Sequence, residues 1–112
     1  MKARAPRFPL VRVKALVGAG SFFVQETKAQ AFHETYRQAA LAVREVCAQL
    51  TERQFARTGS LTWDEADVYG VRYQQRGWYL KLTIDETIPE VAIISFHPLE
   101  RPLRTNAGVT KP

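Results

Sequence analysis

The sequence predicts an α+β domain, with helices packed on one face of an antiparallel sheet of about four strands. Apolar residues recur every three or four positions through the first half of the chain, as amphipathic helices require. After residue 65 the repeat shortens to two, the period of strands that bury one face. A length of 112 residues is enough for one hydrophobic core and too short for two. We therefore expect one domain in which the helices precede most of the sheet.

Two elements are expected near the N-terminus. A short amphipathic helix begins at Pro9 and ends at Gly18 or Gly20, because proline suits a first helical turn and glycine the position just past the end. Residues 21–26, with the sequence SFFVQE, predict a short strand. Its length and polar end favour a place at the edge of the sheet.

The longest helical pattern runs over residues 28–50, without a glycine or proline. Apolar residues are sparse at 33–37, so a break there stays open. His33 lies in a polar stretch and is expected to be solvated. Cys47 falls within the apolar stripe, which favours a buried small side chain over a nucleophile.

Two further segments are expected after the long helix, a short helical turn and a C-terminal tail. Thr51 and Gln54 have the spacing of a capping box, which restarts the helix for a short turn that Gly59 ends. At the other end, residues 99–112 are rich in proline, polar and charged residues and predict a mobile tail. The folded domain is accordingly expected to span residues 1–98.

Three antiparallel strands are predicted from the alternating pattern, over residues 66–75, 77–84 and 91–97. The connection QQRG joins the first two as a β-hairpin. In the middle strand, Trp78 and Leu80 alternate with Tyr79 and Lys81. A slip of one residue would bury the lysine and expose the tryptophan, so Tyr79 and Lys81 are expected on the face away from the helices.

The faces of the two flanking strands are less fully determined by the sequence. In the last strand, strict alternation predicts one face made of Val91, Ile93, Ser95 and His97. In the first strand, one set of side chains alternates with another: Val68, Gly70, Arg72 and Gln74 against Asp67, Tyr69, Val71 and Tyr73. The sequence leaves open which of these two sets faces outward, because this depends on register.

The expected outward surface combines cations, a phenol and an imidazole, from Tyr79, Lys81, Ser95 and His97, with Arg57 and Arg72 within reach. This mixture suits single-stranded RNA, because cations hold phosphates and aromatic rings stack on unpaired bases. It also suits RNA cleavage by a base, a cation and an acid acting at one phosphate. A solvated face, on which Lys81 is ordinary and Tyr79 packs against a neighbouring strand, explains the same pattern equally well.

Composition narrows the partners and the chemistry. Sixteen Lys and Arg against eleven Asp and Glu give a net charge of +5, which favours a phosphate-bearing or acidic partner. One cysteine and two histidines exclude an internal disulfide and argue against a metal site, so no metal or other cofactor is expected. No apolar run approaches the roughly 18 residues that indicate a membrane span. The N-terminus lacks the apolar segment of a secretory signal, and a cytoplasmic protein is expected.

The order of several short motifs resembles the MqsR toxins of bacterial type II toxin–antitoxin systems. The likeness covers most of residues 4–97 and is carried by RAP, VKALV, LTERQFAR, DVY, YLKLT and ISF. The resemblance implies a RelE-like α+β fold and an mRNA interferase, an endoribonuclease that cuts messenger RNA at short motifs without a metal or a ribosome. It also implies a cognate antitoxin protein that neutralises the toxin.

The resemblance also implies which residues act. The active-site positions of the family fall on Arg57, Ala66, Tyr79 and His97. Tyr79 matches the family, whereas Arg57 and His97 replace lysines and Ala66 replaces a glutamine. Gly70 stands where the family has an arginine.

These replacements leave two outcomes open. In the first, His97 transfers protons, Arg57 stabilises the phosphorane and Tyr79 completes a rebuilt catalytic site. The RNA-binding residues that accompany this site are Lys81, Arg72 and Ser95. In the second, the chain is an attenuated module that keeps the toxin fold and only binds RNA or protein.

Overall fold

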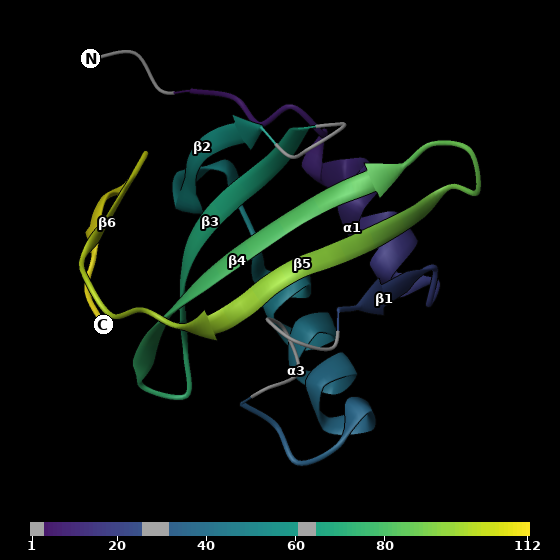
Figure 1. Cartoon of the computed structure of the whole chain (residues 1–112). Coiled ribbons are helices and arrows are strands. Elements are labelled where there is room, and N and C mark those ends of the chain that lie inside the picture. The colour runs from purple at the N-terminus through teal and green to yellow at the C-terminus, as the bar shows by residue number, and fades with distance from the viewer. Residues whose placement is uncertain (1–3, 26–31, 61–64) are drawn as a thin grey trace.

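The computed structural model describes residues 4–25, 32–60 and 65–112 and confirms the α+β class (Figure 1). In chain order the elements are α1 (Leu10–Gly18), β1 (Phe22–Val24), α3 (Tyr36–Gln49), the 3-10 helix η1 (Glu52–Gln54), β2 (Phe55–Ser60), β3 (Glu65–Tyr73), β4 (Arg76–Asp85), β5 (Glu90–Pro98), β6 (Leu103–Thr105) and β7 (Gly108–Thr110). Five strands form one sheet in the order β1-β5-β4-β3-β2, and β6 pairs with β7 in a separate hairpin. β1 runs parallel to β5, and the other neighbouring pairs are antiparallel.

The hydrophobic core lies between the two helices and one face of the sheet (Figure 1). Its fully buried members include Val13 and Val43 from the helices and Leu80, Ile93 and Phe96 from the strands. We call the other side of the sheet the open face. In the described part of the chain, neither helix is long and apolar enough to cross a membrane.

Local signals in the sequence explain where the helices begin. α1 follows the predicted bounds. α3 begins at Tyr36, so the break that the sequence left open at residues 33–37 is present at 33–35, and the prediction of helix is wrong for residue 32. Thr35 caps α3, because its hydroxyl accepts a hydrogen bond from Gln38 N and the Gln38 side chain accepts one from Thr35 N. Residues 28–31 of the predicted helix lie outside the described residues.

The segment after α3 contains a strand that the sequence did not predict. The capping box of Thr51 and Gln54 is confirmed, but it serves only the single turn of η1. Phe55 then takes an extended conformation and buries its ring edge-on against Tyr69. The prediction that Gly59 ends a helical turn is therefore wrong, because Gly59 lies within β2. The main sheet has five strands rather than about four.

β3 and β4 form the predicted hairpin. Its turn consists of Gln74 and Gln75, which have positive φ angles of 51° and 67°, as in the two-residue turns that match the twist of paired strands. The register settles the question that the sequence left open for β3. Tyr69 is fully buried on the core face, whereas Gly70 lies opposite Tyr79 on the open face.

A β-bulge in β5 changes the predicted alternation. The register against β4 shifts by one residue, which leaves Ile94 as the extra residue on β5. Val91 and Ile93 are therefore buried in the core, and the prediction that they share a face with Ser95 and His97 is wrong. The bulge allows β5 to bury apolar residues before it and still turn Ser95 and His97 to the open face.

The segment predicted to be a mobile tail instead forms the β6–β7 hairpin, which packs on the open face (Figure 1). Two backbone hydrogen bonds fix it, from Asn106 N to Phe55 O and from Ala107 N to Arg53 O. The prediction is wrong because the hairpin has little apolar content of its own. It docks on the surface that Gly70 leaves free of a side chain, and no local pattern reveals that partner. The domain therefore includes the hairpin.

Candidate functional site

The open face brings together candidate residues from three strands. Arg57 of β2, Lys81 of β4 and Ser95 of β5 lie in one row across the sheet. Tyr79 and His97 lie directly opposite each other in a second row. Since cross-strand partners project to the same side of a sheet, all five share the open face.

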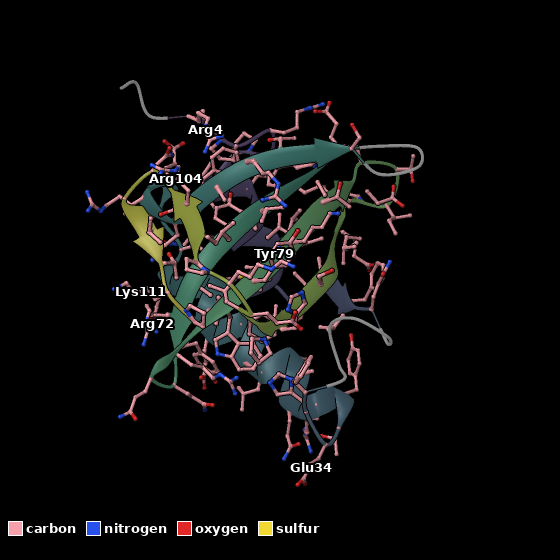
Figure 2. The ribbon with its side chains drawn as sticks, turned by 60° about the vertical axis from the view of Figure 1, so that its left-hand side comes forward. Arg4, Glu34, Arg72, Tyr79, Arg104 and Lys111 are labelled. Carbon is pink, nitrogen blue, oxygen red and sulfur yellow. The ribbon has the colours of Figure 1, made fainter. Side chains whose placement is uncertain are left out.

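Three of these residues line one cavity of about 430 Å³: Arg57, Tyr79 and His97. Its remaining wall is the segment that joins β5 to β6, from Leu99 to Leu103. Figure 2 shows Tyr79 near the middle of the sheet, with the C-terminal hairpin to one side. The structure thus brings the three predicted catalytic residues together around one space of a size suited to a small polar group.

The rings of Tyr79 and His97 are stacked. Their centroids are 4.9 Å apart and their planes differ by 10°. Phe32 extends this aromatic group, because its ring centroid lies 6.4 Å from that of His97. Both stacked rings are half-buried, whereas Phe32 is 57 % exposed. The stack holds the imidazole in one orientation and leaves part of each ring accessible.

A backbone contact selects the tautomer of His97. Its Nδ1 lies 2.9 Å from the carbonyl oxygen of Pro98. A carbonyl oxygen can only accept a hydrogen bond, so Nδ1 carries the proton in this contact. In the neutral ring the lone pair is then on Nε2, which makes Nε2 the atom that can accept a proton from a substrate.

Arg57 supplies a fixed positive charge on the edge strand. The register between β2 and β3 shifts between Phe55 and Arg57, so Ala56 is an extra residue there. Such bulges re-aim the side chain that follows them. Arg57 is exposed and forms no ion pair with a described residue. Its guanidinium is therefore available for an anionic group in the cavity.

The three residues predicted to bind RNA are placed less favourably. Lys81 is half-buried on the open face, and Ser95 is almost fully buried beside it. Neither lines the cavity. Arg72 also lies outside the cavity, and its guanidinium donates a hydrogen bond of 2.9 Å to Lys111 O.

Sequence reasoning missed the residues that the C-terminal segment contributes. Arg101 and Leu103 line the cavity, but both lie in the stretch that was predicted to be a mobile tail. The hairpin also explains why residue 70 has no side chain. A Cβ atom at Gly70 would lie 3.1 Å from side-chain atoms of Leu103, Thr105 and Thr110, so an arginine at this position would displace the hairpin.

Asp67, in the DVY motif, has a structural role. Its buried carboxylate accepts hydrogen bonds from Arg7 N (2.9 Å), Phe8 N (2.8 Å) and the Thr58 hydroxyl (2.7 Å). These bonds tie the segment before α1 to β2 and β3. A buried carboxylate needs such partners, because an unpaired one would carry a large desolvation cost.

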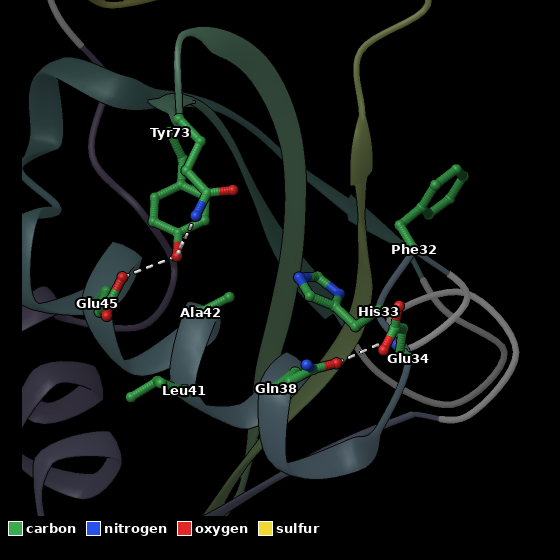
Figure 3. A pocket seen from close by; sticks show the side chains of 9 residues that line it. Phe32, His33, Glu34, Gln38, Leu41, Ala42, Glu45 and Tyr73 are labelled. Atoms are coloured by element: carbon green, nitrogen blue, oxygen red, sulfur yellow. Dashed lines mark hydrogen bonds between the residues drawn. The ribbon is translucent and has the colours of Figure 1, made fainter.

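A second cavity, of about 440 Å³, lies on the helix side of the sheet and contains His33 (Figure 3). The prediction that His33 is solvated is wrong. Its ring stacks on Trp78 and Phe96, with both centroid distances 5.8 Å. Burial lowers the pKa of His33 below its ordinary value, and Nδ1 has no hydrogen-bond partner among the described residues. The rim carries the carboxylates of Glu34 and Glu45, which make this cavity a poor site for a phosphate.

Within the described residues, no three His, Cys, Asp or Glu side chains are grouped so that they could hold a metal ion together. No protein-family model matches the chain, and no curated protein matches it.

Proposed function

We propose that the protein is an endoribonuclease that cleaves single-stranded mRNA at the cavity formed by Arg57, Tyr79 and His97. The observation that carries this proposal is the meeting of a fixed cation, a phenol and an imidazole around one cavity. These are the groups that phosphodiester cleavage by acid–base chemistry needs. They come from three different strands, so their meeting is not a consequence of adjacency in the sequence.

The tautomer of His97 supports the assignment of a separate chemical role to each of the three residues. Nε2 accepts the proton of the ribose 2′-OH, and the 2′-oxygen attacks the adjacent phosphorus. Arg57 stabilises the extra negative charge of the phosphorane. The bond from phosphorus to the 5′-oxygen then breaks, and the Tyr79 hydroxyl protonates the departing oxygen. The products are a 2′,3′-cyclic phosphate and a 5′-hydroxyl end. The proton on His97 returns through solvent to Tyr79, which restores both groups.

The proposal includes the partner that the motif resemblance implies. A cytoplasmic toxin of this kind needs a cognate antitoxin, and the net charge of +5 favours an acidic surface on that protein. The alternative is a module that binds RNA without cutting it. One observation favours this alternative: Ala66, at a position where the family has a glutamine, is fully buried and offers no side-chain hydrogen bond.

The nature of the product ends distinguishes these functions. Purified protein is incubated with a single-stranded RNA in the presence of a chelator, and the fragments are analysed for their end groups. The proposed enzyme gives 2′,3′-cyclic phosphate and 5′-hydroxyl ends, and RNA with a 2′-deoxy sugar at the cut position stays intact. Binding without cleavage would support the alternative and contradict the proposal.

A further inference from the structure

The C-terminal hairpin presents two different faces. Leu103, Thr105 and Thr110 point to the sheet, where they surround Gly70. Arg104, which pairs across the hairpin with Val109, therefore points away from the sheet. Both residues are exposed. The outer face of the hairpin thus carries a cation beside an apolar side chain, directly next to the candidate site.

A second cation lies between the cavity and this outer face. Arg101 is exposed and lines the cavity wall. Only Pro102 and Leu103 separate it from Arg104, so the Cα atoms of the two arginines are at most about 11 Å apart. Neither arginine forms an ion pair with a described residue, whereas Arg7 and Arg12 each meet a glutamate. The charge of these two arginines is therefore available to an external anion.

The hairpin is held firmly enough to fix the positions of these cations. Asn106 lies in the turn of the hairpin and forms several hydrogen bonds with the rest of the protein. Its backbone N–H donates to Phe55 O, its side-chain amide N–H donates to Arg4 O and Glu52 O, and its side-chain oxygen accepts from Arg4 N. Figure 2 shows Arg104 on the hairpin and Lys111 just after it, with Glu34 at the opposite end of the molecule. A rigid cationic surface loses little conformational entropy when it binds a chain of phosphates.

The charges also favour one direction for a strand that leaves the site. Towards the helix layer lies the second cavity, with Glu34 and Glu45 on its rim, and these carboxylates repel phosphates. Towards the hairpin lie two arginines, Arg101 and Arg104, and one carboxylate, that of Glu100, so positive charge is in excess on this side. We propose that single-stranded RNA leaves the catalytic cavity over the C-terminal hairpin, with its flanking phosphates bound by Arg101 and Arg104. This inference rests on the proposed function and adds the path of the substrate.

The test measures how RNA binding depends on salt. The probe is a single-stranded RNA with a 2′-deoxy sugar at the cut position, in a short form that fills the cavity and a longer form that extends past it. Each lost phosphate contact lowers the slope of log affinity against log salt by about 0.7 for a single strand. We expect Arg104→Gln to lower the slope for the longer RNA by about 0.7, and Arg101→Gln/Arg104→Gln by about 1.4.

Matched controls remove the same charge from elsewhere. Arg37→Gln on α3 is the control for the single variant, and Arg37→Gln/Arg44→Gln, also on α3, is the control for the double variant. The controls should keep the wild-type slope, and the affinity gained by lengthening the RNA should be lost only in the hairpin variants. Equal slopes in wild type and hairpin variants would overturn the inference, as would equal losses in hairpin and control variants. Failure of the proposed function is a separate result, because it would appear as a wild-type protein that binds these RNAs but leaves the all-ribose RNA of the same sequence uncut.

Discussion

The two histidines have opposite surroundings, although both rings lie beside aromatic side chains. The His33 ring lies against the apolar rings of Trp78 and Phe96, and its Nδ1 lacks a partner among the described residues. His97 stacks on Tyr79, and its Nδ1 donates to a carbonyl oxygen. The first environment disfavours a charged imidazole, whereas the second orients a neutral imidazole for proton transfer.

The environment of His33 predicts how stability depends on pH. Burial lowers its pKa in the folded protein below the ordinary value of 6.5, so just below that pH the unfolded chain binds more protons than the folded one. The contribution to stability is therefore complete above about pH 6.5 and falls as the pH decreases through that value. We expect His33→Phe to reduce the loss of unfolding free energy between about pH 7.5 and about pH 5.

Urea unfolding of both proteins at the two pH values is the measurement. The comparison uses the difference between pH values within each protein, so a change in packing at His33 cancels to first order. If His33→Phe loses as much stability as wild type over this range, the proposed effect of burial on His33 is wrong.

Among the elements, the docking of the C-terminal hairpin depends on two glycines, Gly70 and Gly77, which leave space for it. A Cβ atom at Gly77 would lie 2.0 Å from Lys111 O and 2.9 Å from Leu99 Cδ1. Gly77→Ala should therefore push the C-terminal segment away from the sheet and lower the unfolding free energy by about 1–3 kcal/mol. Gly59→Ala is the matched control, because nothing lies within 4 Å of a Cβ atom there.

Urea unfolding also measures these glycine variants. Gly59→Ala should be neutral or slightly stabilising, since alanine restricts the unfolded chain more than glycine does. Equal stability of Gly77→Ala and Gly59→Ala would contradict the docked position of the C-terminal segment.

The elements that the sequence did not predict are those whose conformation depends on distant partners. The β3–β4 hairpin and the capping box of Thr51 and Gln54 follow from local patterns, and these predictions are confirmed. The bulge at Ile94 has no local signal, because it arises from the need to bury Val91 and Ile93 while Ser95 and His97 turn outward. β2 was missed for a similar reason, since its pairing with β3 is a contact between separate segments.

The candidate site could be predicted only in part, because some of its residues follow a local pattern and others depend on the docking of the hairpin. The alternation of β4 correctly placed Tyr79 on the open face, and the motif resemblance pointed to Arg57 and His97. The wall formed by Arg101 and Leu103 could not be predicted, because it requires the hairpin to dock on Gly70.

At the scale of the whole molecule, the net charge of +5 predicts how a partner binds. The proposed toxin should meet an acidic surface on its antitoxin, and their association should weaken as salt screens the attraction. We expect the dissociation constant to rise between roughly 50 mM and roughly 500 mM salt, mainly through a slower association rate. Affinity that is independent of salt would contradict an electrostatic interface.

In the proposed mechanism His97 transfers protons at the cavity that it shares with Arg57 and Tyr79. The most direct test of this role is the single-turnover rate of RNA cleavage by wild type and by His97→Ala, measured beside the affinity for RNA with a 2′-deoxy sugar at the cut position. We predict that cleavage falls by roughly 10²- to 10⁴-fold, the usual effect of losing one positioned acid–base group. The affinity should change little, because a neutral imidazole supplies few phosphate contacts. Arg57→Ala, by comparison, should weaken both cleavage and salt-dependent binding. A His97→Ala protein that cleaves RNA as fast as wild type would contradict the assignment of the active site.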